Sequence, residues 1–323
     1  MEALIAITYR CNAKCHMCNT WQFPSKPAEE LTPSDLATLP KLKFANITGG
    51  EPFLRSDIGD FVELLKGKAD RIVISTNGYF TDRIVALARA YPDLGFRISL
   101  EGLPAANDEL RGIKDGFDHG MRTLLQLRSL GVRDIGFGIT LSDRNADDVL
   151  ELYELADAMG LEFATAAVHN TFYFHKSDNV ITQKDRVAGN LEELARRLLK
   201  TNQPKKWFRA WFNMGLSNYV RGGSRLLPCD MGRDVFLVDP FGRVLPCNAM
   251  DAPMGSLKEE TFEEIWASEQ ASDVRTRCSE CDASCWMIGS VAPAMKKHVM
   301  VPASWILRAK LSGTLPPITG LNR

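Results

Sequence analysis

The sequence of 323 residues lacks an excess of either charge, because 39 Lys and Arg stand against 40 Asp and Glu, a formal net charge of -1. A nucleic-acid-binding face needs a basic excess, so we expect no nucleic-acid partner. No apolar run approaches the roughly 20 residues of a membrane-spanning helix. The opening residues, MEALIAITYRC, show no secretory signal. We therefore expect a cytoplasmic protein whose 45% hydrophobic content supplies a large core.

Cysteine is absent between residues 19 and 228, although the chain has eight. Cys11, Cys15 and Cys18 precede this gap. The five that follow it are Cys229, Cys247, Cys278, Cys281 and Cys285. Disulfides are rare in reducing compartments, where clustered cysteines more often bind metal. The gap therefore predicts two separate metal centres.

Short β-rich segments alternate with helical segments up to about residue 200. The predicted strands are residues 3–9, 44–48, 71–76, 96–100, 135–141 and 161–168. Apolar strands separated by helices predict βαβ units with a parallel sheet. Six units are too few for a closed eight-stranded barrel, so the expected fold class is α/β, a partial (β/α)6 TIM-like barrel. In such folds the chemistry lies at the carboxyl ends of the strands.

The pattern also predicts how the chain is divided. We expect the partial barrel over residues 1–204, a bridging helix and linker over 205–228, a small metal-binding domain over 229–290 and a basic amphipathic tail over 291–323. In the small domain, residues 234–247 predict a hairpin and residues 257–277 one amphipathic helix. Ser56 is expected to cap the first barrel helix.

The first cysteine group has the spacing C-x3-C-x2-C and follows the first predicted strand directly. A four-iron cubane needs four ligands, so three cysteines leave one iron open. An open metal position allows a substrate to coordinate there. The alternative is a structural zinc site in which the nearby His16 supplies the fourth ligand.

The segment YRCNAKCHMC resembles the signature of the radical S-adenosylmethionine (SAM) superfamily. The resemblance implies a [4Fe-4S] cluster on Cys11, Cys15 and Cys18, with the methionyl amino and carboxylate groups of SAM on the open iron. One electron, from a donor such as flavodoxin or ferredoxin, would split SAM into methionine and a 5′-deoxyadenosyl radical. The family usually has an aromatic residue before the third cysteine, where this chain has Met17.

Further motifs similar to those of the superfamily stand at the ends of the predicted strands. Gly49-Gly50-Glu51-Pro52 resembles the GGEP motif, whose glycines let the backbone approach the methionyl group and whose carboxylate pairs with its ammonium. The residues that the resemblance assigns to SAM binding are Gly49, Gly50, Glu51, Pro52, Ser75, Asn77, Ser99, Glu101, Arg111, Thr140 and Asn145.

The second cysteine group resembles the SPASM/twitch family of auxiliary-cluster domains, with a hairpin and a helix between its members. Five cysteines cannot fill two cubanes, so we expect a shortened, twitch-like domain with one auxiliary [4Fe-4S] cluster. The expected ligands are Cys229, Cys247, Cys278 and Cys281. Cys285 is then the spare thiol, although Cys281 and Cys285 could exchange roles. Structural zinc is again the alternative.

Two reactions are open once the radical has taken a hydrogen atom from the substrate. An auxiliary cluster can accept an electron from the substrate radical, which gives oxidation (dehydrogenation). Alternatively, the Cys285 thiol can return a hydrogen atom from the opposite face, which gives epimerisation. A chain with two structural zinc sites would instead be a zinc-stapled binding module without catalytic activity.

The expected substrate is a small molecule or a carbohydrate. Peptide-modifying maturases, the remaining alternative, usually carry a leader-binding domain before the barrel, and only ten residues precede Cys11. Candidate substrate contacts are His169, Asn170 and Tyr173, which follow the sixth predicted strand. We treat this substrate class as an analogy at the level of the fold.

The tail combines basic residues with an apolar cluster. The basic residues are Lys296, Lys297, His298, Arg308 and Lys310, and the apolar ones are Trp305, Ile306 and Leu307. Such a segment could rest on an anionic membrane. The interpretation that we favour is that it packs back on the barrel with its charges solvated.

Overall fold

Six parallel strands form the centre of the computed structural model, which describes residues 1–321. They are β1 (Glu2–Ala6), β2 (Phe44–Thr48), β3 (Ile72–Thr76), β4 (Gly95–Ser99), β5 (Ile135–Leu141) and β6 (Glu162–Ala167). Each strand pairs with the next in the chain, in the order β1 to β6. The predicted α/β fold with a partial barrel is confirmed, and the strand bounds differ from the prediction by at most three residues.

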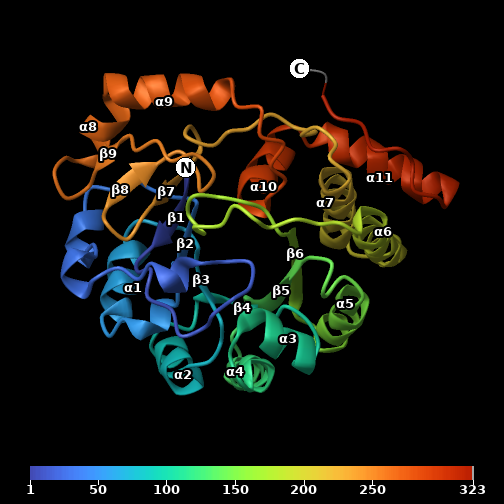
Figure 1. Ribbon diagram of the computed structural model, residues 1–323, viewed down its shortest axis with the longest axis horizontal. Coiled ribbons are helices and arrows are strands. Elements are labelled where there is room, and N and C mark those ends of the chain that lie inside the picture. Colours follow the sequence, from blue (N-terminus) through green and yellow to red (C-terminus); the bar gives the residue numbers. More distant parts are fainter. Residues whose placement is uncertain (322–323) are drawn as a thin grey trace.

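Helices follow the strands and cover the outer face of the sheet (Figure 1). They are α1 (Ile58–Lys66), α2 (Thr81–Ala90), α3 (Pro104–Arg111), α4 (Gly116–Ser129), α5 (Asp148–Ala158) and α6 (Lys184–Lys200). Short 3-10 turns replace a crossover helix between β1 and β2: η1 (Thr20–Gln22), η2 (Pro27–Glu29) and η3 (Pro33–Leu36). The predicted cap at Ser56 is wrong. Asp57 occupies the N-cap of α1, and its carboxylate bonds to Arg55 rather than to the helix.

The two faces of the sheet differ in burial, as strand alternation requires. The helix-facing side chains, such as Ile47, Phe96 and Phe137, are fully buried. Along β2 to β6, several inward-facing residues are small or polar and stay partly exposed: Asn46, Ser75, Ser99, Gly138, Ala164 and Ala166. The inner face of the partial barrel is therefore accessible to solvent.

The predicted hairpin is present as β7 (Val235–Val238) and β8 (Arg243–Leu245), with a short further strand β9 (Gly255–Ser256). β7 pairs parallel with β1, from Glu2 opposite Val235 to Ile5 opposite Val238. The hairpin thus extends the barrel sheet to nine strands, which the sequence pattern did not predict. β6 lies at the opposite edge, so the sheet stays open between β6 and the hairpin (Figure 1).

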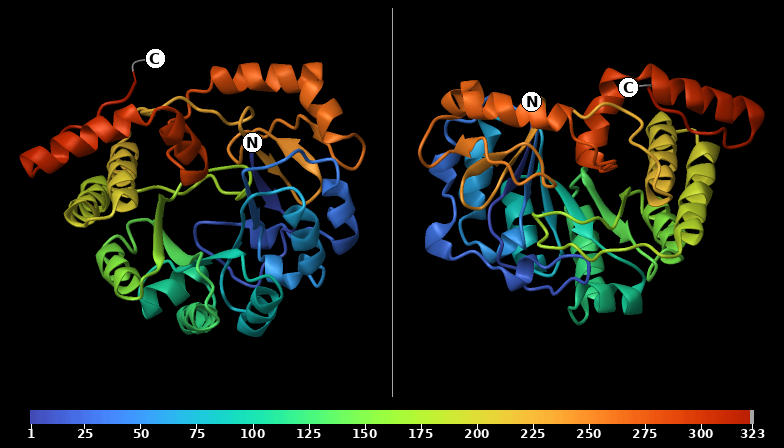
Figure 2. Two further views of the ribbon diagram at one scale, coloured as in Figure 1. Left: turned by 180° about the vertical axis from the view of Figure 1, so that it is seen from behind. Right: turned by 45° about the horizontal axis from the view of Figure 1, so that its top comes forward.

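Five further helices complete the described part of the chain: α7 (Pro204–Val220), α8 (Phe262–Ala267), α9 (Glu269–Ser279), α10 (Ile288–Lys297) and α11 (Met300–Ser312). The single helix predicted over 257–277 is wrong. Thr261 and Glu264 form a capping box for α8, and Ser268 ends it with an extended backbone and caps α9 through Ala271 N. α10 lies on the side where the sheet is open (Figures 1 and 2).

The tail packs on the barrel, as the favoured interpretation expects. Trp305 and Ile306 are buried in the cluster that includes α6 and α7. Lys296 pairs with Glu2 at 3.0 Å, and Lys310 donates to the carbonyl oxygen of Leu199. Of the predicted tail, residues 322 and 323 lie outside the described residues. Among residues 1–321, no helix has the length and apolar character needed to cross a membrane.

Candidate active site

The loop of Cys11, Cys15 and Cys18 leaves the carboxyl end of β1 and lies against the end of α3. The backbone N–H groups of Lys14 and His16 donate to the carbonyl oxygens of Arg111 (2.9 Å) and Leu110 (2.7 Å). Gly112 makes this approach possible, because a Cβ at its position would stand 2.6 Å from the oxygen of Lys14. The three thiols are thus held on one short loop that the barrel fixes in place.

The chemistry of the three thiols suits a metal cluster. Burial raises the pKa of Cys11 to about 12 and also raises the pKa of Cys15, so that neither is a thiolate by itself. Bound cations stabilise thiolates, and the charge of iron would do so here. Within residues 1–321 no three His, Cys, Asp or Glu side chains converge closely enough to hold a single ion. His16, the alternative fourth ligand for zinc, is exposed, and three thiols on one short loop suit a cluster with one open iron.

The two glycines of the GGEP segment let it lie directly on the chain that leads to Cys11. A Cβ on Gly49 would stand 2.3 Å from the oxygen of Thr8, and one on Gly50 would stand 2.2 Å from the oxygen of Arg10. The N–H of Gly50 donates to that Thr8 oxygen at 2.7 Å. Close packing of the chain on itself thus already requires glycine here, before any cosubstrate is considered.

Glu51 is fully buried, and its carboxylate accepts three hydrogen bonds from the chain itself. The donors are the hydroxyl of Thr76 (2.7 Å), the backbone N–H of Asn77 (2.8 Å) and the backbone N–H of Phe53 (3.1 Å). Burial raises the pKa of this carboxyl, against the effect of these donors. Glu51 therefore joins the GGEP segment to the end of β3. Pro52 beside it is buried and begins the turn η4 (Pro52–Leu54).

The end of β3 is in turn joined to the cysteine loop. The side-chain amide of Asn77 donates to the side-chain oxygen of Asn12 at 2.8 Å. The Nδ2 group of Asn12 is buried and has no partner among the described residues. Asn12 was not among the residues predicted from the sequence. The only sequence feature that could have indicated it is its position directly after Cys11.

Four of the residues assigned to SAM from the sequence meet in one network centred on Glu101. Its carboxylate accepts from Arg111 Nη1 (3.1 Å) and from the N–H of Thr140 (2.6 Å). The side chain of Asn145 donates to the carbonyl oxygens of Glu101 (2.7 Å) and Thr140 (3.0 Å). Asn107, which the sequence did not indicate, accepts from the N–H of Glu101 at 2.9 Å.

This network keeps one donor free. The Nε group of Arg111 is buried and has no partner in residues 1–321. Burial raises the pKa of Glu101, and the positive charge of Arg111 opposes that rise. Ser75 and Ser99 lie on the inner face of the strands that lead to these networks, and Ser75 donates to Asn46 at 3.0 Å.

The segment between β6 and α6 crosses the open side of the sheet toward β1 (Figures 1 and 2). Tyr173 in this segment is buried, with its ring 5.6 Å from that of Tyr9 and its hydroxyl without a partner among the described residues. Asn179 donates to the carbonyl oxygen of Met17 at 3.1 Å, within the cysteine loop. This crossing segment therefore lies beside the three thiols.

The other two candidate substrate residues have different surroundings. His169 donates through Nδ1 to the carbonyl oxygen of Ala167 (3.1 Å), and its buried Nε2 finds no partner in the described chain. Burial lowers the pKa of His169, so its ring is neutral. Asn170 exchanges two hydrogen bonds with the backbone of Asn179, at 2.9 and 3.1 Å, which closes the loop. His169 is available to a ligand, whereas the amide of Asn170 is already bonded.

The five cysteines of the second group carry free thiols. Cys278, Cys281 and Cys285 lie at the end of α9 and in the segment before α10, whereas Cys229 precedes β7 and Cys247 follows β8. Burial raises the pKa of Cys247 to about 12 and that of Cys278 to about 11. Negative charge on Cys229 would raise the pKa values of Cys247, Cys278 and Cys285, so Cys229 lies near all three. Arg225 fixes the backbone of Cys285 by donating to its oxygen at 2.6 Å. This set of thiols also suits a cluster.

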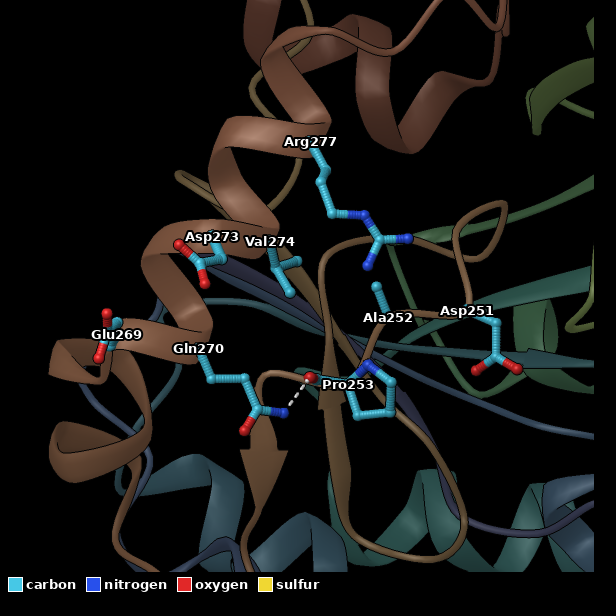
Figure 3. Close-up of a pocket in the computed structure, with 8 residues that line it drawn as sticks. All are labelled: Asp251, Ala252, Pro253, Glu269, Gln270, Asp273, Val274 and Arg277. Carbon is cyan, nitrogen blue, oxygen red and sulfur yellow. Dashed lines mark hydrogen bonds between the residues drawn. The ribbon is translucent and has the colours of Figure 1, made fainter.

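A separate pocket of about 530 Å³ lies between α9 and the segment 251–253 (Figure 3). Its lining residues are Asp251, Ala252, Pro253, Glu269, Gln270, Asp273, Val274 and Arg277. Gln270 donates to the oxygen of Pro253 at 2.6 Å across one side of it. No cysteine and no residue predicted to bind SAM lines this pocket, so we do not assign the chemistry to it.

Comparison with known protein families agrees with this site. Residues 5–156 match the model of the radical SAM superfamily, and residues 229–286 match that of SPASM, an iron-sulfur cluster-binding domain. The chain has a radical SAM domain followed by a SPASM domain. A radical SAM domain implies a [4Fe-4S] cluster and SAM, and a SPASM domain implies auxiliary iron–sulfur clusters.

The names of proteins similar to this radical SAM protein indicate different products. An AdoMet-dependent heme synthase of Methanosarcina barkeri is 25% identical over 311 residues, which cover 85% of this chain and 86% of that protein. The mycofactocin maturase MftC of Mycolicibacterium smegmatis is 27% identical over 75% of this chain and 62% of its own length. The sporulation killing factor maturation protein SkfB of Bacillus subtilis is 24% identical over 87% and 68%.

The solved structures confirm the fold. Native anSMEcpe with bound AdoMet superposes with a TM-score of 0.64 at 14% identity, over 96% of this chain and 99% of that one. Streptococcus suis SuiB bound to S-adenosylmethionine gives a TM-score of 0.65 at 15% identity, over 88% of this chain and 72% of that one. The radical SAM chain thus shares its architecture with proteins that bind the predicted cosubstrate.

Proposed function

We propose that this chain is a radical SAM oxidoreductase that acts on a small molecule. The observation that supports it best is the pair of networks around Glu51 and Glu101, which flank the cysteine loop at the carboxyl ends of the strands. Each network includes a buried donor without a partner in residues 1–321, Asn12 Nδ2 and Arg111 Nε. Buried donors are nearly always satisfied, so a polar cosubstrate is expected at both positions.

Cys11, Cys15 and Cys18 would hold the cluster, with one iron left for SAM. When bound, this cluster supplies the electron that cleaves SAM reductively and so allows hydrogen abstraction from the substrate. Arg111 and Asn12 would orient SAM through their free donors. Glu101 keeps the guanidinium of Arg111 in position, and Glu51 keeps the GGEP segment against the loop. We assign these two carboxylates to positioning rather than to direct contact.

The second group of cysteines would hold one auxiliary [4Fe-4S] cluster, on Cys229, Cys247, Cys278 and Cys281, with Cys285 as the spare thiol. A cluster with four protein ligands has no open iron for substrate, and its natural role is electron transfer. We therefore favour net oxidation of the substrate. Epimerisation with Cys285 as hydrogen donor remains the second reaction, because the chain has one thiol more than a single cluster needs.

A small molecule is favoured over a peptide as substrate. Of the three relatives named above, the one with the largest share of its own length matched, 86%, is named as a heme synthase. The inner face of the sheet has small residues along β4, β5 and β6, which leave room for a ligand within the barrel. Peptide modification is the second candidate, since MftC and SkfB are named as maturation proteins. None of the relatives named here has a carbohydrate in its name. We therefore propose a small molecule without specifying a carbohydrate.

The test is a deuterium-transfer experiment under anaerobic conditions, with specifically deuterated porphyrin precursors, sugars and peptides as candidates. Deuterium in 5′-deoxyadenosine identifies the class of substrate. A product lighter by two hydrogen atoms supports oxidation, and solvent deuterium in a product of unchanged composition supports epimerisation instead. Transfer from a peptide alone would contradict the small-molecule proposal.

A further inference from the structure

A group of charged residues lies at the amino ends of the strands, at the opposite end of the barrel from the cysteine loop. Asp134, just before β5, accepts from Arg71 Nε (2.7 Å) and from Arg97 Nη2 (2.6 Å). These two guanidiniums hold the pKa of Asp134 down, at about 2. Gly95 makes room for this carboxylate, since a Cβ there would stand 2.6 Å from it.

The group faces the interior of the barrel. Arg97 stands opposite Gly136, and Gly136 opposite Glu162, so these three residues form one row across β4, β5 and β6. Arg97 is two residues before Ser99 on β4, and residues two apart on a strand point to the same face. Arg97 and Glu162 therefore share the inner face with the small residues above them.

Arg209 on α7 lies near this row, where it is attracted by Glu162 and repelled by Arg97, and its Nη1 group has no hydrogen-bond partner within residues 1–321. One turn before it, Lys205 bonds to Glu162 at 2.6 Å, and one turn after it, Asn213 accepts from Thr165 at 2.7 Å. These two contacts hold α7 against β6, with Arg209 between them. Arg209 is partly exposed as a residue, but its Nη1 group is shielded from solvent.

The group has more cations than carboxylates, and Glu162 attracts Arg209 through its charge without a hydrogen bond between them. Asp134 and Glu162 are the carboxylates of the group, and Arg71, Arg97 and Lys205 already bond to them. Glu2, the nearest further carboxylate to Arg71, pairs with Lys296. A buried donor without a hydrogen-bond partner costs free energy, so an anionic ligand that accepts from Nη1 and adds negative charge would be favoured here. The guanidinium presents a planar fork that matches a carboxylate or a phosphate.

We propose that Arg209, supported by Arg97, binds an anionic group of the substrate, a carboxylate or a phosphate, at the base of the barrel. This inference rests on the proposed function, because it assigns the ligand to the substrate of the same barrel. Glu101 is four positions after Arg97, just past the end of β4, which is about 13 Å at the usual rise of a strand. The substrate is therefore an elongated molecule, with its anionic group at one end and its reacting carbon near the cysteine loop.

The test uses the reconstituted protein, with inorganic phosphate and succinate as separate probes in a calorimetric titration. The wild type binds at least one probe, and Arg209→Gln weakens binding by about tenfold or more, as the loss of a charge-assisted pair predicts. Tighter binding of phosphate indicates a phosphate ester, and tighter binding of succinate indicates a carboxylate. Arg196→Gln is the matched control, since Arg196 is an exposed guanidinium of α6, and it leaves binding unchanged.

A folding defect is separated from a binding defect by Arg209→Lys. This variant keeps the charge but loses the fork, so its affinity lies between those of the wild type and Arg209→Gln. Equal affinity for both probes in the wild type and Arg209→Gln would overturn the inference, as would no binding of either probe by the wild type at about 10 mM. Iron content and the circular dichroism spectrum of Arg209→Gln show whether the variant is folded, and substrate-free SAM cleavage stays at the wild-type level in the control Arg196→Gln. Loss of SAM cleavage in the wild type itself would instead refute the proposed function and leave the binding result standing.

Discussion

The side-chain amide of Asn77 donates to the side-chain oxygen of Asn12 at 2.8 Å and so ties the end of β3 to the cysteine loop. Asn12 follows Cys11 directly, and Asn77 also donates its backbone N–H to the buried carboxylate of Glu51. Three segments far apart in the sequence thus meet at one hydrogen-bonded chain. The position of the first thiol depends on β3 as well as on its own loop.

Asn77→Ala removes this tie and is expected to weaken SAM binding by about fivefold, which corresponds to one hydrogen bond of about 1 kcal/mol. The measurement is the dissociation constant of SAM for the anaerobically reconstituted protein. Asn190→Ala, which removes an exposed amide on α6, is the control and leaves the constant unchanged. An unchanged constant in Asn77→Ala would show that the loop is fixed without this contact.

Glu51→Gln distinguishes a positioning role from direct contact with SAM. Glutamine offers one acceptor oxygen where Glu51 uses both of its oxygens toward Thr76, Asn77 and Phe53. We expect the free energy of unfolding of the SAM-free protein to fall by about 1–3 kcal/mol, because a buried donor loses its partner. Chemical denaturation measures this. Unchanged stability together with weaker SAM binding would show instead that Glu51 contacts SAM directly.

Asp134 makes the stability of the folded state depend on pH in the acidic range. Because Arg71 and Arg97 lower the pKa of Asp134 from 3.8 to about 2, its ionised form stabilises the folded state at pH values above 3.8. This contribution is lost as the pH falls from 3.8 through about 2. Asp134→Asn should therefore destabilise the protein most at pH 6, and the difference from the wild type should shrink below pH 4. A difference that stays constant from pH 6 to pH 3 would contradict this.

Cys285→Ala separates the two proposed reactions. As the spare thiol, Cys285 can be lost while the protein keeps about eight irons, four for each cubane. Under the oxidation proposal turnover continues, and the product shows no solvent deuterium. Loss of turnover at full iron content would favour epimerisation. A fall to about four irons would identify Cys285 as a ligand in place of Cys281.

The strands and the residues that follow them could be predicted from the sequence, because both depend on local patterns. Alternating apolar runs defined β1 to β6, and each assigned motif stands at or near a strand end. Glu101, Arg111, Thr140 and Asn145 meet in space because the carboxyl ends of neighbouring parallel strands share one edge.

Other features depend on contacts that local patterns do not contain. The pairing of β7 with β1 joins residues more than 200 positions apart, and no periodicity encodes it. The helix break at Ser268 results from a capping serine within an otherwise helical pattern. Arg209 looks in the sequence like any polar residue of an aromatic-rich helix. That its Nη1 group lacks a hydrogen-bond partner depends on the way in which Lys205 and Asn213 hold α7 on β6.

The most direct measurement of the central claim is the iron content and SAM cleavage of the anaerobically reconstituted protein, compared with a variant in which Cys11, Cys15 and Cys18 are all alanine. We expect about eight irons and formation of 5′-deoxyadenosine under a strong reductant for the wild type, and about four irons without cleavage for the variant. Equal iron content in the two proteins, or a wild type that binds zinc and never cleaves SAM, would contradict it.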